Sequence, residues 1–300
     1  VCSRPMLQLL VFGQFISLLT CGTGVLATEL QSGYGVNIPT TQSCLNYVLL
    51  ALIFGTLVAR RGQYWTCLRD RGWRYALVAL IDVEANFCAT IAYRYTTLTS
   101  VQGLDCLTLP TVLVLSAIFL KSRFIWLQLA AVAVCAAGAG VLVYADSRHD
   151  ASTGKSSNRL LGDGLVVLAA LLYGVSNVVQ EGMVKARPTV EYLAFLGLFG
   201  ALISGVQMVI LERAQWRRME WSPAVVGLVL GFGLDLFGMY TLVPVLLQRS
   251  SAVWMNLSSL TADVYSVLFS AFLFHTRFSW LYILGFVLVL AGLAGYTGLS

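Results

Sequence analysis

The chain has 300 residues, of which 58% are hydrophobic and only 11% charged, and its mean hydropathy is +0.80. A soluble globular domain carries about twice that share of charged residues, so the composition excludes a soluble protein. The net charge of +5 does not indicate a nucleic-acid partner, because the Lys and Arg residues lie between apolar runs and mark membrane topology. We therefore predict a polytopic membrane protein.

Ten apolar segments follow one another along the chain, each about as long as the ~20 residues that cross a bilayer core. Their predicted ranges are 7–28, 40–59, 75–95, 98–120, 124–145, 160–182, 190–211, 224–246, 251–274 and 278–298. Short connections between several of them favour antiparallel neighbours. The polar loop at 146–159 joins two five-helix halves, 1–150 and 151–300, which we expect to form one integrated all-α membrane domain.

The two halves carry a repeated sequence. SRFIWL at 122–127 returns as TRFSWL at 276–281, an offset of 154 residues. Because five is an odd number, two halves with like folds must enter the membrane from opposite sides. This predicts inverted repeats related by a pseudo-two-fold axis in the membrane plane, with the binding site of a transporter at their interface.

The basic residues favour a cytoplasmic N-terminus. With the N-terminus inside, more of the 19 Lys and Arg residues lie in inside loops than in outside loops, mainly because of the loop at 60–74. We expect the protein to lie in a plasma membrane or a Golgi-type endomembrane, as a monomer or a homodimer.

Acidic residues inside the apolar runs are the strongest indication of function, because a charge at mid-membrane costs at least about 2.5–3.5 kcal/mol. The acidic residues within or near the predicted spans are Asp82, Glu84, Asp105, Asp163, Glu181, Asp235 and Asp263. A single carboxylate can instead bind hydroxyl or amide groups and hold helices together. So many together favour a polar, acidic cavity.

Two predicted spans open with hydroxyl-rich segments that lead to an aspartate. Residues 96–105 (TTLTSVQGLD) end at Asp105, and residues 250–263 (SSAVWMNLSSLTAD) end at Asp263. The 154-residue offset aligns Asp105 with Ser259, so Asp263 lies one helical turn deeper than its counterpart. We expect these segments, one from each half, to line a central cavity.

Polar residues also recur four apart within single spans, which places them on one helix face. These sets are Tyr173, Asn177 and Glu181 in the sixth span, Asp82 and Asn86 in the third, and Gln42 and Asn46 in the second. Each set fits either a cavity wall or a hydrogen-bonded seam between helices. Glu84 points to a different side of its helix from Asp82.

Nothing in the sequence indicates an enzyme. It contains no His, Cys and acidic cluster at metal-ligand spacing, no phosphate-binding glycine loop and no nucleophile beside a base. We expect no enzymatic activity, no cofactor and no metal.

The segments LIDVEAN at 80–86, YTTLTSVQ at 95–102, LYGVSN at 172–177 and LTAD at 260–263 resemble those of the drug/metabolite transporter superfamily. The chain resembles in particular the F subgroup of solute carrier family 35, over nearly its whole length. The resemblance implies ten helices as inverted five-helix repeats (the EamA-like fold) and a central site open alternately to each side. It also implies a metabolite substrate, since members of this subgroup are linked to deazapurines such as queuine and its nucleoside.

We therefore expect a secondary-active transporter that moves a small polar metabolite, of nucleobase or nucleoside type, by alternating access through an acidic, hydroxyl-rich cavity. The candidate substrate-binding residues are Glu84, Asn86, Tyr93, Thr99, Gln102, Asp105, Tyr173, Asn177, Asn256, Asp263 and Tyr265. Asp105, Asp263 and Glu84 are also candidates to carry a coupled proton, because burial disfavours a charged carboxylate.

Two alternatives stay open. A nucleotide-sugar exchanger of the Golgi or endoplasmic reticulum fits the wider family, but a diphosphate needs cationic partners and the spans contain almost no Lys or Arg. A non-transporting membrane scaffold or receptor fits the hydrophobicity, but has no reason to keep carboxylates at mid-membrane.

Overall fold

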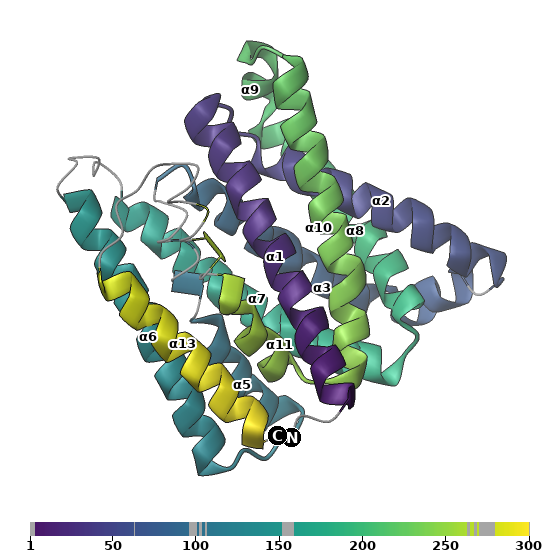
Figure 1. The fold of residues 1–300 in the computed structure, drawn as a ribbon. Coiled ribbons are helices and arrows are strands. Elements are labelled where there is room, and N and C mark those ends of the chain that lie inside the picture. The colour runs from purple at the N-terminus through teal and green to yellow at the C-terminus, as the bar shows by residue number, and fades with distance from the viewer. Residues whose placement is uncertain are drawn as a thin grey trace.

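The computed structural model describes residues 4–62, 64–95, 101, 104–105, 107–151, 159–262, 265–266, 269 and 280–299. All secondary structure in this part of the chain is helical (Figure 1). Six described helices are long and apolar enough to cross a membrane, which supports the predicted polytopic membrane protein. They are α1 (Arg4–Thr28), α2 (Pro39–Arg60), α3 (Tyr64–Ala92), α7 (Arg159–Ala186), α8 (Thr189–Leu211) and α10 (Pro223–Arg249).

Six further helical segments belong to the described part of the chain. They are η1 (Glu29–Gly33), a π-helical turn, together with α5 (Thr108–Phe119), α6 (Trp126–Ala151), α9 (Arg213–Arg218), α11 (Ala252–Ser259) and α13 (Trp280–Leu299). Most of the predicted span at 251–274 beyond 262, and part of the span at 98–120, lie outside the described residues.

Helices α2 and α8 approach each other closely because α8 presents glycines to α2. A Cβ atom on Gly197 would overlap the backbone of α2 at Leu50 and Ala51, and one on Gly200 would overlap the ring of Tyr47. The fully buried Tyr47 ring therefore packs directly against α8 at Gly200, without a side chain in between. This packing directs the Tyr47 hydroxyl toward the middle of the helix bundle, where it reaches α3.

Helices α6 and α13 also pack side by side (Figure 1). The same type of contact occurs twice between them, formed by residues that are equivalent at the 154-residue offset. Gly138 packs against the backbone of Val289, and Gly292 packs against Cys135. The Cys135 thiol donates to the Val289 carbonyl at 3.4 Å, and these two residues are 154 positions apart.

The first turn of α2 is bound by a carboxylate from a distant part of the chain. Glu212, between α8 and α9, accepts hydrogen bonds from the N–H groups of Thr40 at 2.5 Å and Thr41 at 2.9 Å. The Thr41 hydroxyl donates to the same carboxylate and accepts from Trp216 Nε1. A buried anion here satisfies N–H groups that the helix leaves without partners, and it lies at the positive end of the helix dipole.

Replacing Glu212 with Ala is expected to lower the free energy of unfolding by about 2–3 kcal/mol, because buried N–H groups of α2 lose their acceptor. Thermal melting of purified protein in detergent measures the effect. Glu220→Ala is the matched control, since it removes an exposed carboxylate only eight residues away. Equal melting temperatures for the two variants would show that the cap contributes nothing.

Candidate functional site: a central polar cavity

A cavity of about 170 Å³ lies among helices α1, α3, α5, α7, α10 and α11. Its apolar wall includes Ile16, Phe232 and Met255. Its polar lining residues are Thr20, Thr23, Asp82, Asn86, Thr90, Tyr93, Asp105, Thr108, Tyr173, Asn177, Gln180, Tyr240, Asn256 and Ser259. No Lys or Arg occurs among the described residues that line it.

Asp82 is the most heavily bonded carboxyl group of the cavity. Its Oδ2 accepts hydrogen bonds from the hydroxyls of Tyr47 on α2 at 2.7 Å and Tyr240 on α10 at 2.5 Å. Its Oδ1 accepts from Ser176 Oγ on α7 at 3.2 Å. One buried side chain thus connects four helices, and the donors that surround it satisfy both oxygens.

Asn86 lies one turn further along α3 and extends this network. Its Nδ2 donates to the hydroxyls of Tyr240 at 2.6 Å and Tyr47 at 2.9 Å, and its Oδ1 accepts from Tyr173 at 3.0 Å. Asn86 and Tyr240, like Cys135 and Val289, are separated by 154 residues. The amide therefore uses both its donor and its acceptor groups in this network, and the side chain lines the cavity.

Asp105 lines a different part of the cavity, just before α5. The hydroxyl of Thr108 donates to its Oδ1 at 3.0 Å. Tyr93, at the end of α3, lines the cavity as well. This part of the site offers a carboxyl group and an aromatic ring to a bound solute.

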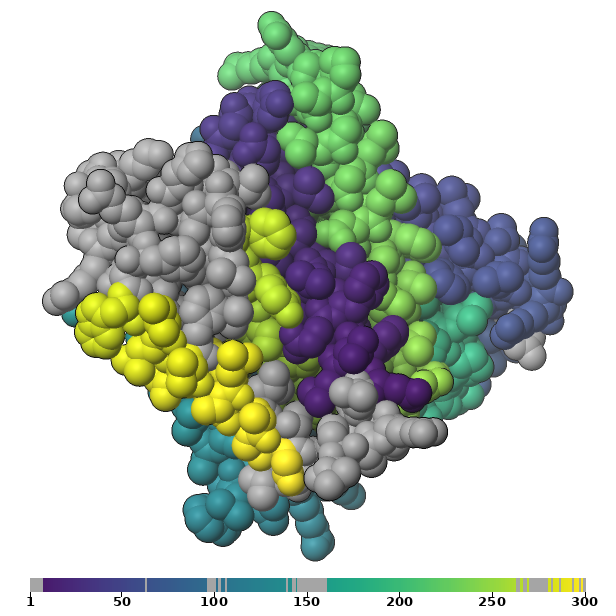
Figure 2. Space-filling model, in the orientation of Figure 1, coloured from purple at the N-terminus to yellow at the C-terminus, as the bar shows by residue number. Residues whose placement is uncertain are grey.

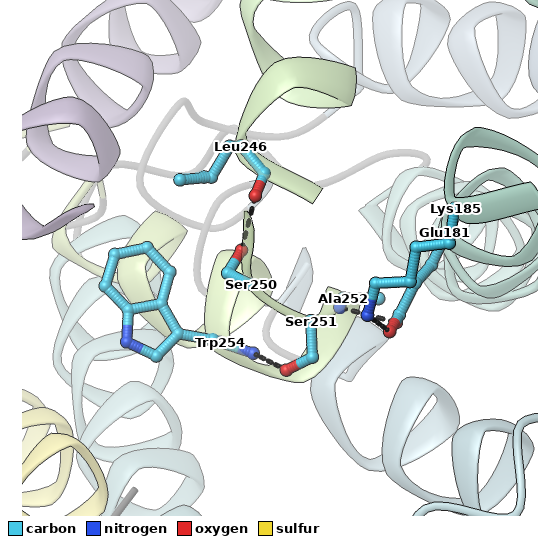
Figure 3. A network of polar contacts seen from close by, with 7 residues as sticks. All are labelled: Glu181, Lys185, Leu246, Ser250, Ser251, Ala252 and Trp254. Atoms are coloured by element: carbon cyan, nitrogen blue, oxygen red, sulfur yellow. Dashed lines mark hydrogen bonds and ion pairs between the residues drawn. The ribbon is translucent and has the colours of Figure 1, made fainter. Parts of the chain in front are cut away.

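Helices α7 and α11 meet at a third part of the site. Asn177 Nδ2 donates to Asn256 Oδ1 at 3.2 Å, and both side chains line the cavity. One turn beyond Asn177, the carboxylate of Glu181 accepts from the backbone N–H of Ala252 at 2.7 Å and from Lys185 Nζ at 2.6 Å (Figure 3). Glu181 thereby binds the first residue of α11.

The structure brings together six of the residues predicted from the sequence. Asn86, Tyr93, Asp105, Tyr173, Asn177 and Asn256 all line the cavity. Thr99, Gln102 and Asp263 lie outside the described residues.

Two further candidates are described but are absent from the lining. Glu84 accepts a hydrogen bond from Gln207 on α8 at 2.5 Å, and Tyr265 donates to Gln14 on α1 at 2.8 Å. Asp82 lines the cavity and shares a helix face with Asn86, but it was not among the predicted substrate-binding residues.

Comparison with known proteins identifies the family. The family model for the F subgroup, described as solute carrier family 35, matches residues 2–298. The chain is 41% identical over 293 residues to solute carrier family 35 member F2 from Mus musculus, covering 97% of this chain and 78% of the relative. The chain belongs to solute carrier family 35. The predicted resemblance is therefore confirmed.

Other comparisons agree with this family. The carrier is 39% identical to member F2 from Xenopus tropicalis over 305 residues, covering 99% of this chain and 78% of the relative. A crystal structure with 19% identity aligns with a TM-score of 0.73, covering 97% of this chain and 98% of that one, and shows that the carrier shares its fold. The relatives are solute carriers, which are transporters rather than enzymes.

Proposed function

We propose that this carrier moves a small polar metabolite of nucleobase or nucleoside type by alternating access through the cavity around Asp82 and Asn86. The observation that carries the proposal is the convergence of carboxyl, amide and hydroxyl groups from four helices on a cavity whose described lining has no Lys or Arg. Such a lining suits a neutral or cationic heterocycle that both donates and accepts hydrogen bonds.

Aromatic and acidic groups add to this preference. Tyr93, Tyr173 and Tyr240 line the cavity with aromatic side chains, and the last two also take part in the hydrogen bonds around Asn86. We assign Asp105 to direct solute binding. The cavity of about 170 Å³ is smaller than the ~300–1,000 Å³ that drug-sized ligands occupy, so the solute is small or the helices separate to admit it.

Contacts between equivalent residues support ten helices arranged as inverted repeats. Residues on a two-fold axis contact their own equivalents, as in an isologous interface. At the 154-residue offset of the sequence repeat, Asn86 bonds Tyr240 and Cys135 bonds Val289. A pseudo-two-fold axis through both contacts would pass through the cavity, which is where a transporter of this type holds its solute.

The orientation with a cytoplasmic N-terminus, in a plasma membrane or Golgi-type endomembrane, is part of the same proposal. A nucleotide-sugar exchanger is less well supported, because a diphosphate finds no Lys or Arg in the described lining.

A ligand screen by thermal shift on the purified carrier tests the proposed solute class. The compounds are queuine, its nucleoside, common nucleobases and nucleosides, and nucleotide sugars. A ligand present at 100 times its dissociation constant should stabilise the folded protein by about 2.7 kcal/mol. We expect stabilisation by a nucleobase or nucleoside, followed by its uptake into liposomes that contain the protein. Stabilisation and uptake of a nucleotide sugar alone would refute the proposal.

A further inference from the structure

Asp235 lies near the middle of α10, on the face that packs against α1. This contact, which we call the α1–α10 seam, is formed by Gly231 against Leu26, Asp235 against Gly22, and Gly238 against Leu19. Figure 2 shows the two helices running side by side across one face of the molecule. The flanking residues on this face of α10, Gly231 and Gly238, carry no side chain.

The Asp235 carboxyl group lies against bare backbone. A Cβ atom on Gly22 would be 2.5 Å from Asp235 Oδ2, so any other residue at position 22 would require the carboxyl group to move. The side chain is half-buried and has no hydrogen-bond or ion-pair partner in the described part of the chain. An ionised carboxylate in this position, without water or a cation, is costly in a membrane. The closed seam therefore suits the neutral acid.

The surroundings of Asp82 differ sharply from those of Asp235. Ser176, which donates to Asp82, is the 154-residue equivalent of Gly22. The 154-residue equivalent of Asp82 is Leu236, the residue next to Asp235, so beside Asp235 the seam has a residue without a side chain where the other half has a hydroxyl donor. Asp82 is surrounded by donors, whereas the described residues supply none to Asp235.

Few other titratable groups lie on the helices packed against α10. Cys21 on α1 contacts Ser266, α11 has none, and those along α2, α7 and α8 are Cys44, Tyr47, Tyr173 and Tyr192. The charged side chains of these elements lie toward helix ends, at Glu29, Arg60, Asp163, Glu181, Lys185 and Glu191. No cation among the described residues is placed to neutralise Asp235.

We propose that Asp235 is a proton-binding site outside the solute cavity, which couples transport to protons through the α1–α10 seam. The carboxyl group takes one proton from water as the seam closes and returns it to water when the seam opens. No other reactant is required. This inference rests on the proposed transport function.

The seam adjoins the cavity, so its movement changes the solute site. Phe232, Leu236 and Met239 flank Asp235 on α10 and line the cavity, as does Thr20 on α1. The Thr20 hydroxyl contacts Met239 Sδ at 3.5 Å across the seam. Separating α1 from α10 to hydrate Asp235 therefore also opens one wall of the cavity.

Infrared difference spectra of the purified carrier in lipid nanodiscs, recorded between acidic and alkaline buffers, test proton binding without any solute. The wild type should show a carbonyl band of a protonated carboxylic acid that Asp235→Asn lacks and Asp235→Glu retains at a shifted frequency. An unchanged difference spectrum in Asp235→Asn would overturn the proposal. Asp235→Ala gives the same comparison if the Asn variant does not fold.

Uptake into liposomes tests the coupling, with queuine as the probe. An imposed gradient of one pH unit should change wild-type accumulation about tenfold for one coupled proton. Asp235→Asn should show no response to the gradient while queuine still shifts its melting temperature. A gradient response equal to that of the wild type, or a wild type without any response, refutes the coupling. If the wild type neither binds nor moves queuine, the proposed solute fails, and the infrared comparison still decides the proton site.

Discussion

Replacing Asp82 with Asn is expected to slow solute uptake by about 10- to 100-fold. The Asp82 carboxyl group accepts hydrogen bonds from Tyr47, Tyr240 and Ser176, and an amide offers one acceptor oxygen where the carboxyl group has two. Losing a hydrogen bond to a charged group costs about 1.5–3 kcal/mol, and 1.4 kcal/mol corresponds to a factor of ten. Initial rates of uptake into liposomes measure the effect.

Glu84→Gln is the matched comparison for Asp82→Asn. Glu84 lies two residues along the same helix, carries the same functional group and bonds Gln207 on α8 rather than a cavity residue. We expect a smaller loss of uptake than for Asp82→Asn, with a similar amount of folded protein in both variants. If Glu84→Gln is the more damaging change, the solute does not bind around Asp82.

The helices of this carrier were predictable because each apolar run is long enough to cross a bilayer. The six long helices begin and end close to the predicted limits, apart from the N-terminal extension of α3 to Tyr64. That extension, residues 64–74, is polar and basic, and its low hydropathy predicts a loop. Its helical start is stabilised by tertiary contacts with α8, such as Arg71 with Glu191 at 3.4 Å and the Tyr64 ring with Phe195, which have no signature in the local sequence.

The site was predictable only in part. The sequence shows which residues share a face of a helix, but not which neighbouring helix or cavity that face meets. Asp82 and Glu84 differ by about 200° around α3. Glycines on α8 determine which of them meets the cavity, since Gly200 leaves space for Tyr47 to reach Asp82. The pairing of Asp82 with Asn86 on one face of α3 indicated that this face meets the cavity. Leu80 and Cys88, four positions from Glu84, gave no such indication for the opposite face.

Replacing Glu181 with Gln is expected to open the end of the cavity where α7 meets α11. The buried carboxylate binds the Ala252 N–H at the first residue of α11, the helix that carries Met255, Asn256 and Ser259 of the lining (Figure 3). A neutral amide weakens this charge-assisted bond and its interaction with the helix dipole, by about 1.5–3 kcal/mol in all. The rate at which a membrane-impermeant maleimide labels a cysteine introduced at Ser259 should rise about 10- to 100-fold.

Lys185→Ala separates the contribution of the ion pair from that of the helix contact. Lys185 pairs with Glu181 four residues earlier, but its side chain is 42% exposed against 4% for Glu181. An ion pair with one exposed partner contributes about 0–1 kcal/mol, so this variant should label at a rate within about fivefold of the parent Ser259→Cys protein. Equal acceleration in both variants would mean that the lysine, and not the carboxylate on α11, keeps α7 and α11 together. If labelling becomes faster in Glu181→Gln alone, the bond between Glu181 and the start of α11 is what keeps this end of the cavity closed.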